Sequence, residues 1–241
     1  MDHTNNSCCC GEAEHFSGCL ICGAPITYRA ESSIQTCSIC HKEQLTNAVC
    51  ENGHFICDAC HSYGTYAPVI TTLRDSTEKD ALLLLEKIMD LPSVHMHGPE
   101  HHAIVPCVLL TAFRNNGEHM DYDAALSEIC KRAKQVPGGT CGYWGGAAAG
   151  AGIFMSVMTG SSPLHKDAWP FPQKLVSIIL SRLADVGGPR CCKRTSRIAI
   201  EEAVHFYSQF CSVNIPLSSI TCKYCEDNRE CIQEDCPYYP E

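Results

Sequence analysis

Cysteine pairs separated by two residues recur near the beginning of this chain. Together with one further cysteine and one histidine they form a series of eight soft ligands: Cys19, Cys22, Cys37, Cys40, Cys50, His54, Cys57 and Cys60. A Cys-x₂-Cys knuckle lets two thiolates reach one Zn²⁺ at about 2.3 Å while backbone N–H groups point at the sulfurs. Eight ligands are enough for two tetrahedral sites. The sequence therefore predicts a module over residues 19–66 that binds two zinc ions.

The order of these ligands leaves two ways of pairing them. From Cys37 onward it resembles the first six ligands of a RING or treble-clef finger, with the first cysteine pair in place of the missing last pair. A cross-braced solution joins Cys19, Cys22, Cys50 and His54, and separately Cys37, Cys40, Cys57 and Cys60. A sequential ribbon pairing is the alternative, and His61 or His41 can replace His54. Closed four-ligand sites are structural, so we expect this module to fold on metal and perform no chemistry.

The chain has 20 cysteines among 241 residues, a density that indicates a disulfide scaffold in short secreted proteins. No secretory signal is visible in the polar first seven residues, and the weakly polar run at 145–160 is shorter than the roughly 20 residues a membrane span needs. We therefore predict a cytoplasmic protein with metal-binding thiols and, because exposed thiols oxidise, an anaerobic host. Residues 1–18 are expected to be flexible, with Cys8, Cys9 and Cys10 as metal scavengers or extra ligands.

The net charge of −9 argues against nucleic acid as a partner, because neutralising phosphates takes a surplus of lysine and arginine. It also disfavours a zinc-finger regulator of nucleic acid. One basic cluster remains, formed by Arg190, Lys193, Arg194 and Arg197. We expect it to hold a small anion.

Helical periodicity dominates residues 78–211. Glycine, proline and capping residues divide this region into about six helices, near 78–90, 99–115, 121–136, 144–158, 172–186 and 195–210. The helix at 144–158 is so rich in glycine and alanine that something must approach its backbone closely. We predict a mainly α fold: a helical bundle core, an N-terminal treble-clef or ribbon-like zinc module, and a short cysteine-rich tail at 212–241.

Four histidines and one glutamate lie together in the segment from Val94 to His102. Part of it matches the inverted zinc-protease pattern H-x-x-E-H, but Gly98 and Pro99 break the helix which that pattern needs, so we exclude a protease. We predict instead that four of these residues bind metal or move protons in catalysis: His97, Glu100, His101 and His102. A helix N-terminus lowers the pKa of the last two imidazoles and favours their ligating form. The alternative is that the histidines cap helices and pack on one another.

Two further segments carry candidate reactive thiols. Cys141 precedes a helix N-terminus, where backbone N–H groups stabilise a thiolate, and Gly139 and Gly142 leave room beside it for a cofactor or substrate. Cys191 and Cys192 are adjacent, so a disulfide between them would close a strained ring and would stabilise the fold poorly. We expect the flanking Arg190, Lys193 and Arg194 to lower the pKa of both thiols and to bind the cofactor or anion.

The tail contains a set of four thiolates, Cys222, Cys225, Cys231 and Cys236, and Pro237 follows the last of them. Ferredoxin-type runs also end in Cys-Pro, but their spacing is tighter. Either a [4Fe–4S] cluster or a further zinc ion fits this set, and the absence of histidine and the trailing proline favour the cluster. The central thiols are a second possible location for such a group.

The order of five motifs in this chain resembles that of a cysteine-rich family of unknown function. These motifs are Cys-x₂-Cys-His61, His95-Met-His-Gly-Pro-Glu-His-His, Gly-Gly-Thr-Cys141-Gly-Tyr-Trp-Gly, Gly-Gly-Pro-Arg-Cys191-Cys-Lys-Arg and the Cys-Pro tail. The likeness covers most of residues 19–240. It implies an anaerobic bacterial or archaeal protein, sometimes fused to a class I methyltransferase, and no established activity. Cys107, Cys141 and Cys191 are more weakly similar to a redox-active family with a Gly-Cys-Ala-x-x-Gly core, although Gly142 replaces the alanine.

These features together predict an oxygen-sensitive metalloenzyme that performs redox or sulfur-transfer chemistry on a small anionic or sulfur-containing substrate. The three central thiols would ligate a cluster or carry sulfur. The alternative is a non-catalytic adaptor or metal-delivery protein whose zinc module docks a partner such as a methyltransferase. We expect neither nucleic acid nor a membrane as a partner.

Overall fold

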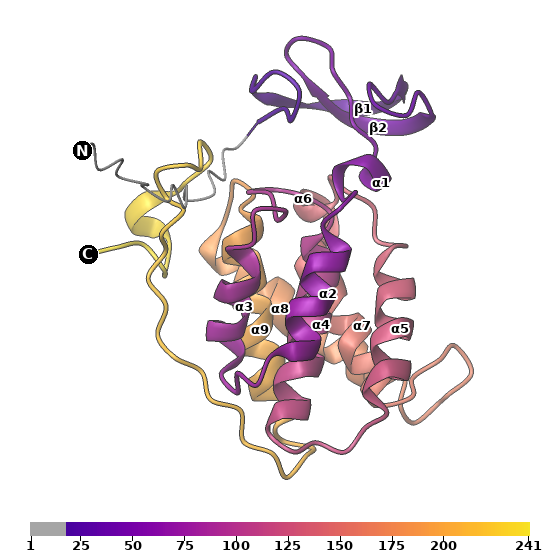
Figure 1. Ribbon diagram of the computed structural model, residues 1–241, viewed down its shortest axis with the longest axis vertical. Coiled ribbons are helices and arrows are strands. Elements are labelled where there is room, and N and C mark those ends of the chain that lie inside the picture. Colours follow the sequence, from indigo (N-terminus) through magenta and orange to yellow (C-terminus); the bar gives the residue numbers. More distant parts are fainter. Residues whose placement is uncertain (1–17) are drawn as a thin grey trace, which may run out of the picture.

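The computed structural model describes residues 18–241, and Cys8, Cys9 and Cys10 lie outside them. The described chain is mainly helical, as predicted (Figure 1). Its elements are β1 (Ile26–Thr36), β2 (Glu43–Cys50), α1 (Asp58–His61), α2 (Tyr66–Asp75), α3 (Ala81–Met89), α4 (His101–Asn115), α5 (Tyr122–Ala133), α6 (Cys141–Trp144), α7 (Gly146–Met158), α8 (Pro170–Val186), α9 (Cys192–Tyr207) and the 3₁₀-helix η1 (Gln233–Asp235). None of the described helices combines the length and apolar character that crossing a bilayer requires.

The two strands form an antiparallel hairpin that lies across one end of the helices (Figure 1). The register pairs Ile26 with Cys50 and Thr36 with Glu43, and an irregularity falls between Tyr28 and Ser33. The short helix α1 connects the hairpin to the helical part of the chain. The hairpin therefore covers the end at which α4 and α7 begin.

Helix α4 is the central helix of the fold. All its residues from His101 to Phe113 are buried, and it contacts α2, α3, α5, α7 and α9. A helix that is apolar all round needs neighbours on every side, which explains this position. Phe113 packs on Phe154 of α7 and Tyr207 of α9, with ring centroids 5.5 and 4.8 Å away. These ring contacts hold the C-terminal part of α4 against α7 and α9.

The close approach predicted at the glycine-rich helix is made by α4. A Cβ on Gly150 would lie 2.7 Å from the carbonyl oxygen of His102, and a Cβ on Gly146 would lie 2.1 Å from Nε2 of the same residue. The predicted helix at 144–158 is divided because Gly145 has φ +71°, a conformation that favours glycine. Glycine in α7 therefore makes room for a histidine of the neighbouring helix.

Most other predicted helices agree with the structure to within about three residues, but one helix was missed and the start of another has a specific cause. Helix α2 was not predicted, because Pro68 in its first turn and the short apolar face of Val69 and Leu73 obscure the pattern. Helix α9 begins at Cys192 rather than at Thr195. The Cys191 side chain acts as its N-cap, accepting from the backbone N–H of Arg194 at 3.4 Å. A cysteine is an uncommon cap, which explains the difference.

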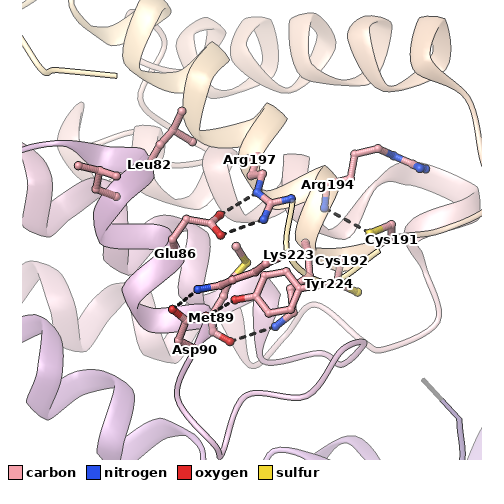
Figure 2. Close-up of polar contacts among 12 residues, drawn as sticks. Leu82, Glu86, Met89, Asp90, Cys191, Cys192, Arg194, Arg197, Lys223 and Tyr224 are labelled. Atoms are coloured by element: carbon pink, nitrogen blue, oxygen red, sulfur yellow. Dashed lines mark hydrogen bonds and ion pairs between the residues drawn. The ribbon is translucent and has the colours of Figure 1, made fainter. Parts of the chain in front are cut away.

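After α9 the chain runs back along the helices to the end covered by the hairpin (Figure 1). Figure 2 shows how α3 holds the returning tail and α9 together. The guanidinium of Arg197 forms two hydrogen bonds with the carboxylate of Glu86, at 2.7 and 2.9 Å. Asp90 accepts from the Tyr224 hydroxyl and pairs with Lys223. These contacts place the tail cysteines against the start of α9.

Candidate metal and thiol sites

The first cysteine–histidine set is at the open end of the hairpin. It consists of Cys19, Cys22, Cys50 and His54, whose ligand atoms all lie within 4.8 Å of one another. The Sγ atoms of Cys22 and Cys50 are 3.9 Å apart, and His54 Nδ1 is 3.3 Å from Cys22 Sγ. Tetrahedral ligands about 2.3 Å from zinc are separated by about 3.8 Å, so the set fits this ion. Gly53, with φ +82°, makes the turn that brings His54 back to Cys50.

The second set consists of Cys37, Cys40, Cys57 and Cys60, again within 4.8 Å of one another. The Sγ atoms of Cys40 and Cys57 are 3.6 Å apart, and the backbone N–H of Cys57 donates to Cys37 Sγ at 3.3 Å. Both sets can hold zinc, and their membership is the cross-braced solution rather than the sequential ribbon. His41 and His61 belong to neither set.

A cavity of about 630 Å³ separates the hairpin from the helices. From the hairpin side Tyr28, Asn47 and His54 line it. The helical side contributes residues from the three predicted central motifs: His97, His102, Gly139, Cys141, Gly142, Arg190 and Cys192. Glu100, His101, Cys191, Lys193 and Arg194 do not line this cavity, so the structure brings together only part of the predicted central site.

Cys141 and His102 form a thiol–imidazole pair in this cavity. Cys141 Sγ lies 3.9 Å from His102 Nε2, while His102 Nδ1 lies 3.3 Å from the carbonyl oxygen of Val136. The carbonyl can only accept, so it holds the proton on Nδ1 and leaves the Nε2 lone pair directed at the thiol. A nucleophile, a base and a third group that orients the base are the elements of an activated thiol.

The surroundings of Cys141 favour its thiolate. A hydrogen bond with Cys192 lowers the pKa of the Cys141 thiol to about 6, aided by the N–H of Gly146 and the charge of Arg190 and opposed by burial. Gly146 is the first residue of α7, so the helix N-terminus expected beside this thiol belongs to α7. When one of the two thiols loses its proton, Cys141 is the thiolate and Cys192 keeps its proton and donates the hydrogen bond.

The prediction that flanking cations lower the pKa of Cys191 and Cys192 is wrong. Burial raises the pKa of Cys191 to about 11, against the N–H of Arg194. The pKa of Cys192 is raised by its hydrogen bond with Cys141 and by burial. Both cysteines lie at the start of α9 among buried neighbours, where a charged thiolate loses its hydration. Cys192 is therefore a proton donor and Cys191 a helix cap.

The basic cluster is also used differently from the prediction. Lys193 is fully buried, with Nζ 3.3 Å from the carbonyl oxygen of Met89, and Arg194 donates to the carbonyl oxygens of Gly187 and Pro189. Of the four residues of the predicted basic cluster, only Arg190 lines the cavity, 4.8 Å above the Tyr28 ring. We therefore retain Arg190 as the candidate anion-binding residue.

The other predicted histidines occupy separate positions. His97 is buried, and its Nε2 lies 3.1 Å from Asn228 Oδ1 and 3.2 Å from Glu230 Oε2 in the tail. His101 is fully buried and its Nδ1 lies 3.2 Å from the carbonyl oxygen of Gly98. Burial, reinforced by the charge of Lys193, holds the pKa of His101 well below its usual range. The predicted direction for His101 is confirmed, but burial rather than the helix N-terminus is the main cause.

Glu100 lies between His61, which the sequence suggested only as a substitute for His54, and His95, which was not among the predicted catalytic candidates. Its Oε2 is 3.4 Å from His61 Nδ1 and its Oε1 is 3.1 Å from His95 Nδ1. Burial tends to raise the pKa of the Glu100 carboxyl, but its contacts with the two imidazoles hold that pKa well below its usual range. The only sequence signals were the position of His61 directly after the last Cys-x₂-Cys pair and the position of His95 within the histidine-rich segment.

The tail cysteines Cys222, Cys225, Cys231 and Cys236 line a second, small cavity together with Cys191, Arg194 and Arg197. Among the described residues, no three of these thiols lie within 4.8 Å of one another, unlike the two hairpin sets. The structure therefore brings five thiols and two guanidinium groups to one cavity.

Comparison with known proteins places these features in a family without assigning them an activity. No curated protein and no solved structure was found to match the chain. One family model matches residues 69–239, which include the histidine-rich segment, Cys141, Cys191, Cys192 and the tail cysteines. The chain therefore belongs to the family of unknown function DUF5714.

Proposed function

We propose that the protein is a thiol-dependent enzyme that transfers sulfane sulfur from a small anion, with Cys141 as the nucleophile. The observation that carries the proposal is the oriented pair of Cys141 and His102, with Cys192 as a second thiol, inside a cavity large enough for a small substrate. Arg190 is the cationic residue that lines this cavity nearest the thiols and would attract an anion. Nucleophile, orienting base and anion-binding group are the parts that such a reaction requires.

Thiosulfate illustrates the substrate class. The Cys141 thiolate attacks the outer sulfur of thiosulfate, the S–S bond breaks, and sulfite leaves with the bonding electron pair. The product is a persulfide on Cys141. Attack by Cys192 on the inner sulfur then forms a disulfide between the two cysteines and releases hydrosulfide, which takes up the Cys192 proton. An external dithiol returns the disulfide to two thiols by exchange.

The experiment incubates anaerobically purified protein with thiosulfate and measures the mass of the peptide that contains Cys141. We expect this peptide to gain one sulfur atom and the solution to gain sulfite. Cys141→Ser should abolish both products, and Arg190→Ala should raise the thiosulfate concentration needed for half-maximal labelling. Cys211→Ser is the matched control, because Cys211 lies beyond α9 and lines neither cavity. Unchanged sulfite release from Cys141→Ser would overturn the proposal.

As a second part of this proposal, the tail cavity holds a [4Fe–4S] cluster. Its support is the number of thiols in one cavity, their separation beyond zinc-ligand distances, and the positive charge of Arg194 and Arg197. When bound, such a cluster would supply single electrons. Acid-labile sulfide and iron measured on protein purified without oxygen test this assignment. Tail zinc without labile sulfide would contradict it.

The adaptor function is retained as a second candidate because of one surface feature. Ile34 and Leu45 are opposite one another in the hairpin register, and their exposed fractions are 60% and 62%. Exposed apolar pairs on a sheet are typical of contacts with a partner. An adaptor should bind a purified class I methyltransferase equally well with and without Cys141, and should lose binding in Ile34→Ser/Leu45→Ser. Absence of binding by the unmodified chain would remove this candidate.

A further inference from the structure

Three ligand atoms outside both cysteine sets converge at the wall of the large cavity. They belong to His61, the last residue of α1, to His95 in the segment between α3 and α4, and to Glu100, which precedes α4. All three atoms lie within 4.8 Å of one another. The zinc-binding hairpin and the helical part of the chain therefore each contribute to one cluster.

The distances within this cluster are those between ligands of one metal ion. The contacts of Glu100 with His61 Nδ1 and His95 Nδ1 measure 3.4 and 3.1 Å. Nitrogen and oxygen ligands about 2.1 Å from a metal are about 3.0 Å apart in octahedral and about 3.4 Å apart in tetrahedral geometry. The two imidazole rings meet at 66° with centroids 4.6 Å apart, so they converge edge-on rather than stack.

The cluster also contains polar atoms whose hydrogen bonding is incomplete. Glu100 is fully buried, yet its Oε2 has no hydrogen-bond partner, and neither does the buried Nδ1 of His61. A buried carboxylate with an unsatisfied oxygen is destabilising unless a cation offsets its charge. The two unpartnered atoms face each other at 3.4 Å. A cation bound to both would satisfy them together.

The backbone around Glu100 is arranged to keep the carboxylate in this position. The N–H of His95 donates to Oε1 at 3.2 Å. A Cβ at Gly98 would lie 2.1 Å from Oε2, so only glycine leaves space for the carboxylate there. The arrangement of a ligand by neighbouring backbone groups is characteristic of metal sites that are formed before the ion binds.

We propose that His61, His95 and Glu100 bind one divalent transition-metal ion, distinct from the two hairpin ions. Two imidazoles and one carboxylate form the ligand set of catalytic zinc sites and of non-haem ferrous sites, which both leave positions open for water or substrate. His61 and His95 line the cavity that also contains Cys141. The ion therefore faces the same space as the reactive thiol, and it can bind an anionic or sulfur-containing ligand there.

The test is a metal count on anaerobically purified protein loaded with Co²⁺, compared among variants. His95→Ala and His61→Ala should each contain one ion fewer than the unmodified chain. The sulfur-to-cobalt charge-transfer absorption should be retained, because the lost ion has no thiolate ligand. His205→Ala, at an exposed position of α9, is the matched histidine control and should bind the full number of ions.

Circular dichroism accompanies each count, and His95→Ala is the milder variant because His95 is partly exposed whereas Glu100 is not. Folded His95→Ala and His61→Ala proteins with undiminished cobalt would overturn the proposal and leave a histidine–glutamate ion pair. Separate titrations with Zn²⁺ and Fe²⁺ then show which ion the site retains. Cys141→Ser should keep this ion, so failure of the sulfur-transfer proposal and failure of the metal site are distinguishable.

Discussion

Nε2 of His102 lies 3.9 Å from Sγ of Cys141, although 39 positions separate the two residues in the chain. The contact exists because α4 and α7 pack together where Gly146 has no side chain. One residue of α7 therefore both leaves space for the imidazole and donates its N–H to the thiol. The environment of the Cys141 thiol therefore depends on this helix contact.

The first prediction concerns the pH dependence of Cys141. Because its pKa is lowered to about 6, we expect alkylation by iodoacetamide to be nearly constant above neutral pH and to fall as pH decreases through about 6. Cys192→Ala removes the hydrogen-bond donor that contributes most to the low pKa of Cys141, so the midpoint should move to higher pH. Peptide mass spectrometry provides the rates. Cys211, whose thiol pKa is raised by burial, should react only at more alkaline pH in the same sample.

A second prediction tests the close contact at Gly146. Gly146→Ala should destabilise the protein by about 1–3 kcal/mol, because the added Cβ would lie 2.1 Å from His102 Nε2 and the core cannot yield freely. Alanine is otherwise the better helix former by about 1 kcal/mol. Thermal unfolding provides the measurement. Gly142→Ala is the matched control, since a Cβ there meets no atom within 4 Å. Equal stability of the two variants would contradict the helix contact.

Removal of one hairpin ligand is the basis of a third prediction. Cys57→Ser should lower the zinc content by at least one ion and destabilise the hairpin, because structural zinc contributes roughly 10–16 kcal/mol of apparent binding free energy. We expect most of the helical circular dichroism to remain, since the hydrophobic cluster of the helices lies apart from the hairpin. Cys211→Ser should keep both ions. Full zinc occupancy in Cys57→Ser would exclude Cys57 as a ligand.

The fourth prediction concerns the buried ion pair that holds the tail. Arg197 is fully buried and Glu86 accepts both of its hydrogen bonds, so Arg197→Leu leaves a mostly buried carboxylate without its partner. Such a loss typically destabilises a protein by about 3–5 kcal/mol. Arg74→Ala breaks the exposed pair with Asp123 and should cost about 1 kcal/mol or less. Denaturant unfolding distinguishes the two, and similar values for both variants would show that burial of Arg197 contributes little.

Local patterns were sufficient to predict much of this protein. Cysteine spacing gave the two ligand sets of the hairpin as one of two pairings, and glycine and proline positions gave most helix boundaries. Contacts between distant segments were not predictable in this way. The pairing of His61 with Glu100 requires the hairpin to be placed over α4, and the burial of Lys193 requires the packing of α9 against α3. A cationic residue next to a cysteine in the sequence suggests a lowered thiol pKa, but only the packing shows where its side chain lies.

Cys60 and His61 are consecutive, so a ligand of the second hairpin set is bonded directly to a residue that faces the cavity. The position of His61 therefore depends on the structure of the second ligand set. If the second set binds zinc as proposed, we expect this set to be filled before the His61 imidazole reaches Glu100. Protein prepared without zinc should then have its helices formed but lack the contact between His61 and Glu100.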